Sequence, residues 1–81
     1  MTHDELRRAL FDSLAAVAPE ARGRELAGGA DLREELDLDS MDFLRVLVGI
    51  KERTGIDVPE ADAPKLFTLE GALEYLSRRQ P

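Results

Sequence analysis

The sequence predicts an all-α fold: a four-helix bundle of three main helices and one short helix, with a long loop between the first two main helices. Apolar residues recur at helical spacing in three separate stretches, and each stretch follows a residue type that favours a helix start. No stretch shows the alternation of apolar and polar residues that is typical of a strand. The 81 residues are enough for one small domain, residues 1–81, in which amphipathic helices bury their apolar faces together.

The first main helix is predicted over residues 2–17. Thr2 and Glu5 have the spacing of a capping box, in which each side chain accepts a hydrogen bond from the backbone N–H of the other residue. Pro19 cannot continue the helix and ends it. The apolar stripe that faces the core consists of Leu6, Leu10, Leu14 and Val17.

Residues 18–38 form the long connection. Loops of more than about 15 residues are uncommon in compact domains unless they are functional or packed on the core. Gly23, Gly28 and Gly29 interrupt regular structure, and only a short helical turn is predicted, near residues 31–35. Four leucines are expected to pin this connection to the core: Leu26, Leu32, Leu36 and Leu38.

The second main helix is predicted over residues 39–53. Asp39 or Ser40 caps its N-terminus, and Gly55 suits the left-handed residue that follows its last turn. Gly49 in mid-helix costs about 0.8–1 kcal/mol relative to alanine, which indicates that another element approaches closely there.

The last third of the chain is predicted to contain the short helix and the third main helix. Residues 56–59 are expected to be extended, and a short helix follows near residues 60–66. Pro64 is acceptable only in the first turn of such a helix. The third main helix covers residues 68–79, with Thr68 as its N-terminal cap. Its apolar stripe consists of Leu69, Leu73 and Leu76.

The composition excludes several classes of protein. Cysteine is absent, so the chain has no disulfide, no thiolate metal site and no thiol chemistry of its own. The single histidine, His3, argues against a multi-histidine metal site and a serine–histidine–aspartate hydrolase, and no metal site is expected. A net charge of −6 argues against nucleic acid and anionic membranes as partners and favours a basic protein surface.

The negative charge is concentrated in residues 31–62. This segment contains ten acidic and four basic residues, so its net charge of −6 equals that of the whole chain. Within residues 31–42, six residues are acidic and one is basic. One interpretation is a solvated loop that keeps the protein soluble. The other is a docking surface for a basic partner, which the position of Ser40 inside the segment favours.

The second main helix carries more apolar residues than one core-facing stripe needs, because seven of the ten residues 41–50 are apolar. The core face consists of Phe43, Val46, Leu47 and Ile50. Met41, Leu44 and Val48 lie on a neighbouring strip, at positions i, i+3 and i+7. We expect Met41 and Val48 to contact a partner, whereas core packing explains Leu44 equally well.

Ser40 admits three interpretations. A serine before an apolar run is most often a helix cap. A catalytic nucleophile needs a base within hydrogen-bond reach, and His3 is not expected to reach Ser40. The third interpretation is a phosphate ester, because the free N–H groups and the dipole at a helix N-terminus stabilise a phosphate attached there.

Three blocks of sequence follow one another along the chain. Residues 36–44 read Leu-Asp-Leu-Asp-Ser-Met-Asp-Phe-Leu, residues 54–60 read Thr-Gly-Ile-Asp-Val-Pro-Glu, and residues 68–76 read Thr-Leu-Glu-Gly-Ala-Leu-Glu-Tyr-Leu. The first block resembles the Leu-Gly-x-Asp-Ser-Leu/Met core of acyl carrier proteins, and the others resemble the loop after the second helix and the last helix of that family. The resemblance extends over about residues 4–78 and implies an acyl-carrier-like four-helix bundle.

The resemblance implies a carrier rather than an enzyme. In this family the serine of the Asp-Ser pair receives 4′-phosphopantetheine from coenzyme A through a phosphopantetheinyl transferase, and the terminal thiol of this arm carries acyl groups as thioesters. Ser40 matches the attachment serine. Asp39 matches the aspartate that the transferase recognises, and Met41 matches the adjoining apolar contact. The thiol that the chain lacks therefore arrives with the cofactor.

The resemblance also implies further partners and an acyl pocket. The expected partners are acyl-loading and acyl-using enzymes, such as a ligase, a ketosynthase or an acyltransferase. The residues that match the partner-binding face are Asp37, Asp42, Leu44, Arg45, Val48, Val58 and Glu60. The residues that match the acyl pocket are Leu47, Ile50, Ala63, Leu66 and Ala72.

The chain departs from the family pattern at several positions. Asp37 stands where glycine is usual, and aspartate is among the residues that tolerate a left-handed backbone. Arg45 stands where carriers of fatty-acid synthesis are acidic, and Lys51 and Arg53 further dilute the negative charge of this helix. We therefore expect a specialised discrete carrier, for polyketide synthesis, lipid modification, or an aminoacyl or other activated acid, rather than a housekeeping fatty-acid carrier.

Two other functions stay open: a cofactor-free helical module for protein–protein interaction, and a small hydrolase that uses Ser40. Residues 10–18 have some features of a signal peptide, but Asp12 interrupts them, and Asp4 and Glu5 stand where positive charge is needed. No uncharged run is long enough to span a membrane. We expect a cytoplasmic monomer without membrane insertion.

Overall fold

The computed structural model describes residues 1–80. Its elements are α1 (His3–Val17), η1 (Pro19–Gly23), α2 (Leu32–Glu35), α3 (Ser40–Thr54), η2 (Glu60–Leu66) and α4 (Leu69–Arg79), where η denotes a 3₁₀-helix. The described residues contain no strand, so the all-α prediction is confirmed. The three main helices begin and end within one residue of their predicted bounds. The short helix η1 was not predicted.

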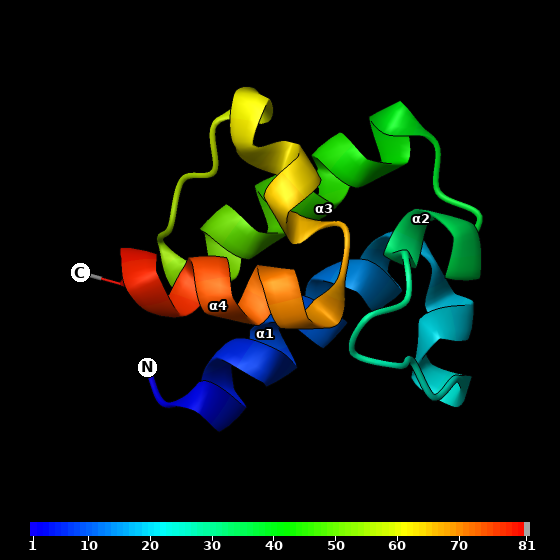
Figure 1. Ribbon diagram of the computed structural model, residues 1–81, viewed down its shortest axis with the longest axis horizontal. Helices are drawn as coiled ribbons and strands as arrows, with labels where there is room; N and C mark the ends of the chain where they lie inside the picture. Colours follow the sequence, from blue (N-terminus) through cyan, green and yellow to red (C-terminus); the bar gives the residue numbers. More distant parts are fainter. Residues whose placement is uncertain (81) are drawn as a thin grey trace.

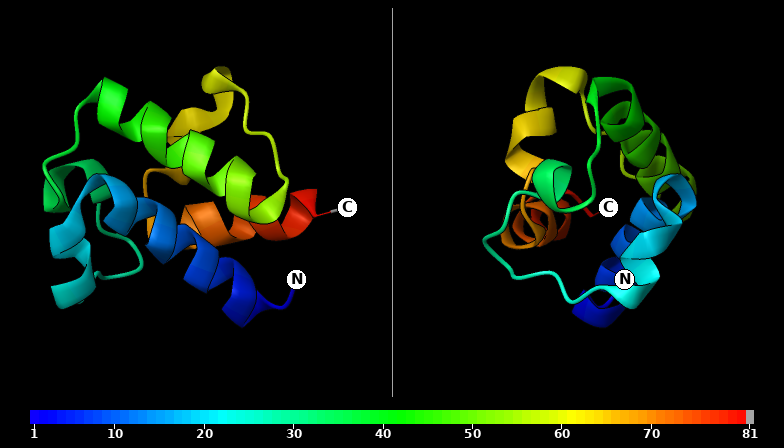
Figure 2. Two further views of the ribbon diagram at one scale, coloured as in Figure 1. Left: turned by 180° about the vertical axis from the view of Figure 1, so that it is seen from behind. Right: turned by 90° about the vertical axis from the view of Figure 1, so that its right-hand side faces the viewer.

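The helices surround one apolar core. α1 packs against α3 and α4, and α4 also packs against η2. Figures 1 and 2 show α1 and α3 side by side, running in opposite directions. The start of α1 and the end of α4 lie at one end of the bundle, where the Met1 amino group donates a hydrogen bond to Gln80 Oε1 at 2.7 Å. α3 begins at the other end.

The long connection between α1 and α3 is held down by its leucines, as predicted. Leu32, Leu36 and Leu38 are buried in the core, and Leu26 packs against its edge. Asp37 lies between two of these anchors in the left-handed conformation, with φ of 51°. The expectation that an aspartate adopts this backbone in place of glycine is therefore confirmed.

The close approach predicted at Gly49 is made by α1. A Cβ atom on Gly49 would lie 3.3 Å from both Cβ and Oγ of Ser13. Ser13 is buried, and its hydroxyl donates to the Ala9 carbonyl at 2.8 Å, so this polar side chain is satisfied within its own helix. The two small residues let α1 and α3 pack closely along the middle of the bundle.

The prediction that Pro64 lies in the first turn of the short helix is wrong. Pro64 is the fifth of the seven residues of η2. In the interior of an α-helix a proline ring clashes with the carbonyl of residue i−4, whereas a 3₁₀-helix pairs each N–H with the carbonyl of residue i−3. Hydrogen bonds from Asp62 N to Pro59 O (2.8 Å) and from Phe67 N to Pro64 O (3.3 Å) close the two ends of η2. The tighter helix thus accommodates the proline.

Candidate functional site

The start of α3 is capped by Asp39 and not by Ser40. Asp39 Oδ1 accepts a hydrogen bond from the backbone N–H of Asp42 at 2.8 Å, and Asp42 Oδ2 accepts one from the backbone N–H of Asp39 at 3.2 Å. This reciprocal capping box satisfies the first turn without the serine. Ser40 is the first residue of the helix and is exposed, and its hydroxyl has no hydrogen-bond partner within residues 1–80. The hydroxyl is therefore accessible and is not used by the helix cap.

The loop before Ser40 fixes the position of this hydroxyl. Leu36 and Leu38 are buried on either side of Asp37, whose left-handed backbone turns the chain between them. The backbone N–H of Leu38 donates to the carbonyl of Arg33 at 2.8 Å, which closes the loop onto α2. The leucine anchors leave Asp37, Asp39 and Ser40 on the surface.

A cleft of about 220 Å³ lies beside Ser40. It is lined by Arg33, Ser40, Phe43, Leu44, Glu60, Ala63, Pro64 and Phe67. These residues come from α2, α3, η2 and the turn after η2, so the cleft exists only once the four segments have assembled. The backbone N–H of Leu32 donates to the carbonyl of Phe67 at 2.7 Å and joins α2 directly to that turn.

Aromatic rings and one guanidinium form a wall of this cleft. The Phe43 and Phe67 rings meet edge to face, with centroids 5.0 Å apart and an interplanar angle of 80°. The Arg33 guanidinium carbon lies 3.6 Å from the centroid of the Phe67 ring. Two hydrogen bonds join Arg33 to Asp31, from Nε to Oδ1 at 3.2 Å and from Nη2 to Oδ2 at 2.9 Å.

The contact between Arg33 and Asp31 changes the acidity of both groups. The hydrogen bond from Arg33 lowers the pKa of Asp31, against a smaller opposing effect of burial. The same hydrogen bond raises the pKa of Arg33. Both side chains are therefore charged at neutral pH, and Arg33 presents a positive charge in the same cleft as Ser40.

A second, larger groove of about 580 Å³ adjoins this cleft. Leu44 and Glu60 line both hollows. The other residues of the groove are Leu47, Val48, Lys51, Glu52, Asp57 and Val58. Four of the residues predicted for partner binding thus meet along one surface: Leu44, Val48, Val58 and Glu60.

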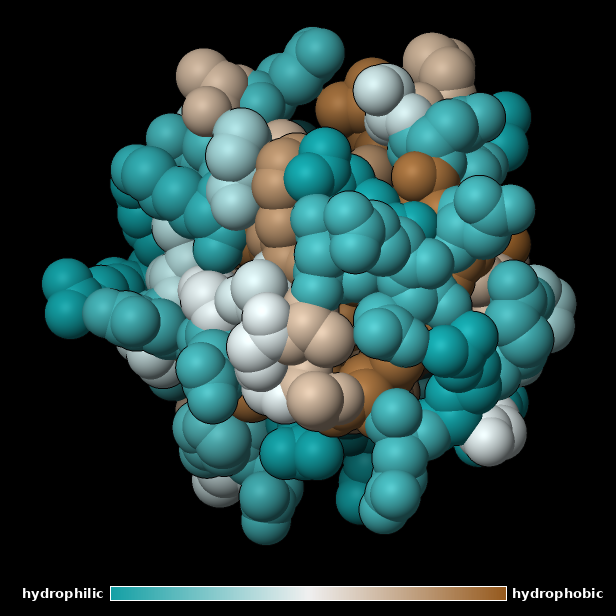
Figure 3. Space-filling model, turned by 45° about the vertical axis from the view of Figure 1, so that its right-hand side comes forward, coloured by the Kyte–Doolittle hydropathy of each residue, from teal (hydrophilic) through white to brown (hydrophobic). Residues whose placement is uncertain are grey.

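The predicted partner residues differ in their exposure. Met41 and Val48 are 61% and 58% exposed, the highest values for large apolar side chains within residues 1–80. Val58, by contrast, is buried and lines the larger groove. Asp37 is exposed on the loop, Arg45 is exposed on α3, and Arg45 Nη1 lies 3.5 Å from Asp42 Oδ1. Figure 3 shows separate apolar patches on a mostly hydrophilic surface in a view that brings the right-hand side of Figure 1 forward.

The residues predicted for the acyl pocket are all buried in the single core. Ala63 lines the cleft beside Ser40, and Leu47 lines the larger groove. Ile50, Leu66 and Ala72 lie deeper and line neither of these two hollows. The predicted set therefore divides between surface hollows and packed interior.

Sequence reasoning did not single out Arg33, Phe43, Pro64 or Phe67 as residues of the site. Phe43 was assigned to the core, where it is buried, and its edge also lines the cleft. Arg33 is the single basic residue within residues 31–42, which is the one signal that sets it apart in the sequence. Phe67 carries no comparable signal, because its contacts with Leu32 and Arg33 of α2 form only in the folded structure.

Within residues 1–80, no group of three or more histidine, aspartate or glutamate side chains is arranged to hold a metal ion. None of the described helices combines the length and the apolar character that a membrane span requires.

Comparison with known families identifies this arrangement. A family described as the phosphopantetheine attachment site matches residues 8–76. Proteins named acyl carrier protein are similar along most or all of this chain. The one from Rubrobacter xylanophilus is 32% identical over 56 residues, which is 69% of each chain. The chain belongs to the acyl carrier protein family. The acyl carrier protein from Lactobacillus johnsonii is 28% identical over 80 residues, or 99% of each chain.

The cofactor of this carrier family, 4′-phosphopantetheine, is compatible with the residues at the start of α3. Attachment needs an accessible hydroxyl that the fold does not use, and the Ser40 hydroxyl is exposed and free of hydrogen bonds within residues 1–80. The cleft beside Ser40 offers apolar surface from Phe43 and Phe67 and a cation from Arg33.

Proposed function

We propose that the Ser40 hydroxyl is the attachment point of 4′-phosphopantetheine, and that the protein carries acyl groups or related activated acids between partner enzymes. The observation that carries this proposal is the exposed Ser40 hydroxyl, which is free because Asp39 caps α3 in its place. Once attached, the arm supplies a terminal thiol that holds the cargo as a thioester. The chain itself has no cysteine for this purpose.

Attachment requires a separate phosphopantetheinyl transferase. The single histidine of the chain is no base for Ser40, since α1 begins at His3 and Figure 1 shows the start of α1 at the opposite end of the bundle from the start of α3. In the transfer, the Ser40 oxygen bonds to phosphorus of coenzyme A and its proton passes to the transferase. The diphosphate bond breaks, and adenosine 3′,5′-bisphosphate leaves.

The surface around Ser40 supplies the contacts for the transferase and for acyl-handling enzymes. Asp37, Asp39 and Glu60 are exposed and give this side of the molecule a negative charge that steers a basic partner. Met41 and Val48 offer exposed apolar contacts on the same helix as Ser40. Asp42, Leu44, Arg45 and the buried Val58 complete the proposed partner face.

The proposed cargo is a short or medium acyl chain for a specialised pathway. Leu47 and Ala63 line the two hollows next to the arm, and Ile50, Leu66 and Ala72 form the interior behind them. Lys51 lines the larger groove, and Arg45 stands on the same helix. These cations make α3 less acidic than a helix that docks to basic fatty-acid synthesis enzymes, which favours partners with a mixed charge pattern.

The test is conversion with coenzyme A and a broad-specificity phosphopantetheinyl transferase, followed by mass spectrometry. The wild type is expected to gain the mass of one phosphopantetheinyl group, and Ser40→Ala is expected to gain none. Ser77→Ala is the matched control, because Ser77 is an exposed serine on α4. Ser40→Ala is expected to change the free energy of unfolding by less than about 0.5 kcal/mol, since the cap is Asp39.

Two results would contradict the proposal. A wild-type protein of unchanged mass would favour the cofactor-free interaction module, which shares the acidic surface and the exposed Met41 and Val48. Ester hydrolysis by the unmodified protein, abolished in Ser40→Ala, would favour the hydrolase.

A further inference from the structure

Arg33 is the only basic residue within residues 31–42, a segment that also contains six carboxylates. It lines the same cleft as Ser40. Every other charge in this segment repels an anion on the Ser40 hydroxyl. The fold has therefore placed the one cation of the segment beside the one hydroxyl that it leaves free.

The Arg33 side chain is held in place from two sides. Its guanidinium stacks on Phe67 at 3.6 Å, and Asp31 accepts one hydrogen bond from Nε and one from Nη2. Because both neighbours already restrict its rotamers, Arg33 loses less side-chain entropy on binding a ligand than an unrestrained arginine loses. The ion pair leaves 43% of the Arg33 side chain exposed.

Three of the five guanidinium N–H donors of Arg33 have no acceptor within the part of the chain that the structure describes. Asp31 occupies the N–H of Nε and one of Nη2, and the donors of Nη1 and the second N–H of Nη2 remain. Planar guanidinium donors bind phosphate oxygens with charge-assisted hydrogen bonds. Arg45 is the other arginine near Ser40 in sequence, but it contacts Asp42 and does not line the cleft.

We propose that the Arg33 guanidinium binds the phosphodiester of the arm attached to Ser40, and that Arg33 is a positioning residue that directs the arm along the Phe43–Phe67 wall. This inference rests on the proposed attachment at Ser40. The phosphodiester provides two acceptor oxygens and one negative charge, which match the remaining donors and charge of Arg33. Asp31 and Phe67 keep the guanidinium at the cleft in the absence of the arm.

The experiment compares each variant before and after conversion with coenzyme A and excess transferase, with the mass of each product verified. The variants are Arg33→Gln, Arg33→Lys, Arg45→Gln and the double variant Asp31→Asn with Arg33→Gln. The double variant keeps the net charge of the wild type, and asparagine caps α2 as well as aspartate does. The readouts are the change in Tm on conversion and the ³¹P chemical shift of the phosphodiester.

In the wild type and in Arg45→Gln, the change in Tm on conversion is expected to be more positive by about 2–6 °C than in Arg33→Gln and the double variant. The ³¹P chemical shift of the phosphodiester in Arg33→Gln and in the double variant is expected to differ from that in the wild type. Arg33→Lys keeps the charge without the planar fork and is expected to restore part of the effect.

Three outcomes would overturn the inference. The first is a double variant that behaves as the wild type, because the effect in Arg33→Gln would then come from the unpaired Asp31. The second is an Arg33→Gln variant with an unchanged Tm difference. The third is a folded Arg33→Gln that is not converted, since Arg33 would then serve the transferase. A wild type that gains no mass refutes the attachment itself, and the mass readout separates that failure from the other three.

Discussion

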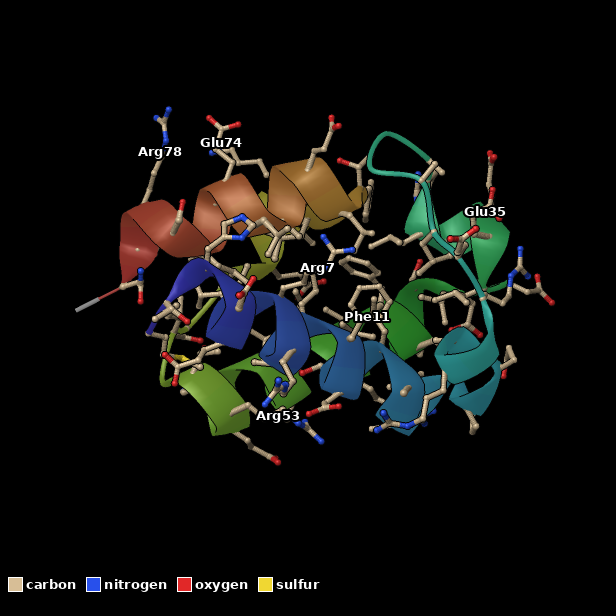
Figure 4. The ribbon with its side chains drawn as sticks, turned by 90° about the horizontal axis from the view of Figure 1, so that it is seen from below. Arg7, Phe11, Glu35, Arg53, Glu74 and Arg78 are labelled. Carbon is tan, nitrogen blue, oxygen red and sulfur yellow. The ribbon has the colours of Figure 1, made fainter. Side chains whose placement is uncertain are left out.

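In two clefts of this molecule an arginine guanidinium lies over a phenylalanine ring, and only one of these clefts is also lined by a serine. The cleft beside Ser40 has a volume of about 220 Å³ and contains the Arg33–Phe67 stack. The cleft at α1 is larger, about 500 Å³, and contains Arg7 above Phe11 at 5.7 Å. Figure 4 shows the side chains of Arg7 and Phe11 close together beside α1.

The two clefts differ in whether a hydroxyl lines them and in whether an ion pair holds their arginine. None of the side chains that line the α1 cleft carries a hydroxyl: they are Arg7, Phe11, Arg24, Glu25, Leu26 and Ala27. Arg7 takes part in none of the ion pairs found within residues 1–80, whereas Arg33 is fixed by Asp31. A capped helix start, a free hydroxyl and an oriented cation favour the smaller cleft as the candidate site, whereas volume alone would favour the cleft at α1 over it.

The largest expected effect concerns the two phenylalanines. Phe67→Ala removes a ring that contacts both Phe43 and Arg33, and it is expected to lower the free energy of unfolding by about 2–3 kcal/mol. Phe11→Ala removes a half-buried ring with the more distant Arg7 and is expected to cost about 1–2 kcal/mol. Urea denaturation of both variants measures the difference. Equal losses would mean that the aromatic wall beside Ser40 is no better packed than the cleft at α1.

A smaller loss of stability is expected when the N-terminal cap of α3 is removed. Asp39→Ala is expected to cost about 1 kcal/mol and to speed hydrogen exchange of the Asp42 amide, which donates to Asp39. Thr2→Ala removes the corresponding capping box of α1 and serves as the control. It should lower stability by a similar amount and leave the Asp42 amide unchanged. Faster exchange in both variants would show that the first turn of α3 depends on the whole bundle and not on its own cap.

The smallest expected effect is a difference between Arg33→Gln and Arg7→Gln in how the free energy of unfolding depends on pH. Because the pKa of Asp31 is lowered in the folded protein, this carboxylate contributes stability above its unfolded pKa of about 3.9 and loses it as the pH falls through the lower folded value. Arg33→Gln removes the main cause of the lowered pKa, so its stability should fall less steeply than that of the wild type below about pH 4.

Arg7→Gln is the control for this pH effect, because Arg7 forms no ion pair within residues 1–80. Its free energy of unfolding is expected to follow the acid-range profile of the wild type when thermal unfolding is measured from about pH 5 to pH 2.5. A shallower profile in Arg7→Gln would show that general charge balance, and not the contact between Arg33 and Asp31, sets the acid sensitivity.

The sequence by itself determined the helices and the position of the serine. Thr2, Glu5 and Thr68 act on their own first turns, and Gly55 adopts the left-handed conformation after α3, with φ of 76°. Such signals act over three or four residues, so they can be read without knowledge of the fold. The exposed strip of Met41 and Val48 was also predictable, since one helix of a small domain cannot bury residues on all sides.

Only the tertiary structure decided which residue caps α3 and what surrounds Ser40. Asp39 and Ser40 were equally good caps in the sequence, and the loop held by Leu36 and Leu38 gives the role to Asp39. Arg33 and Phe67 meet because a backbone hydrogen bond joins Leu32 to Phe67 across the fold. Capping and helical periodicity are local interactions, whereas the walls of a cleft come from segments that the chain brings together only when its core is packed.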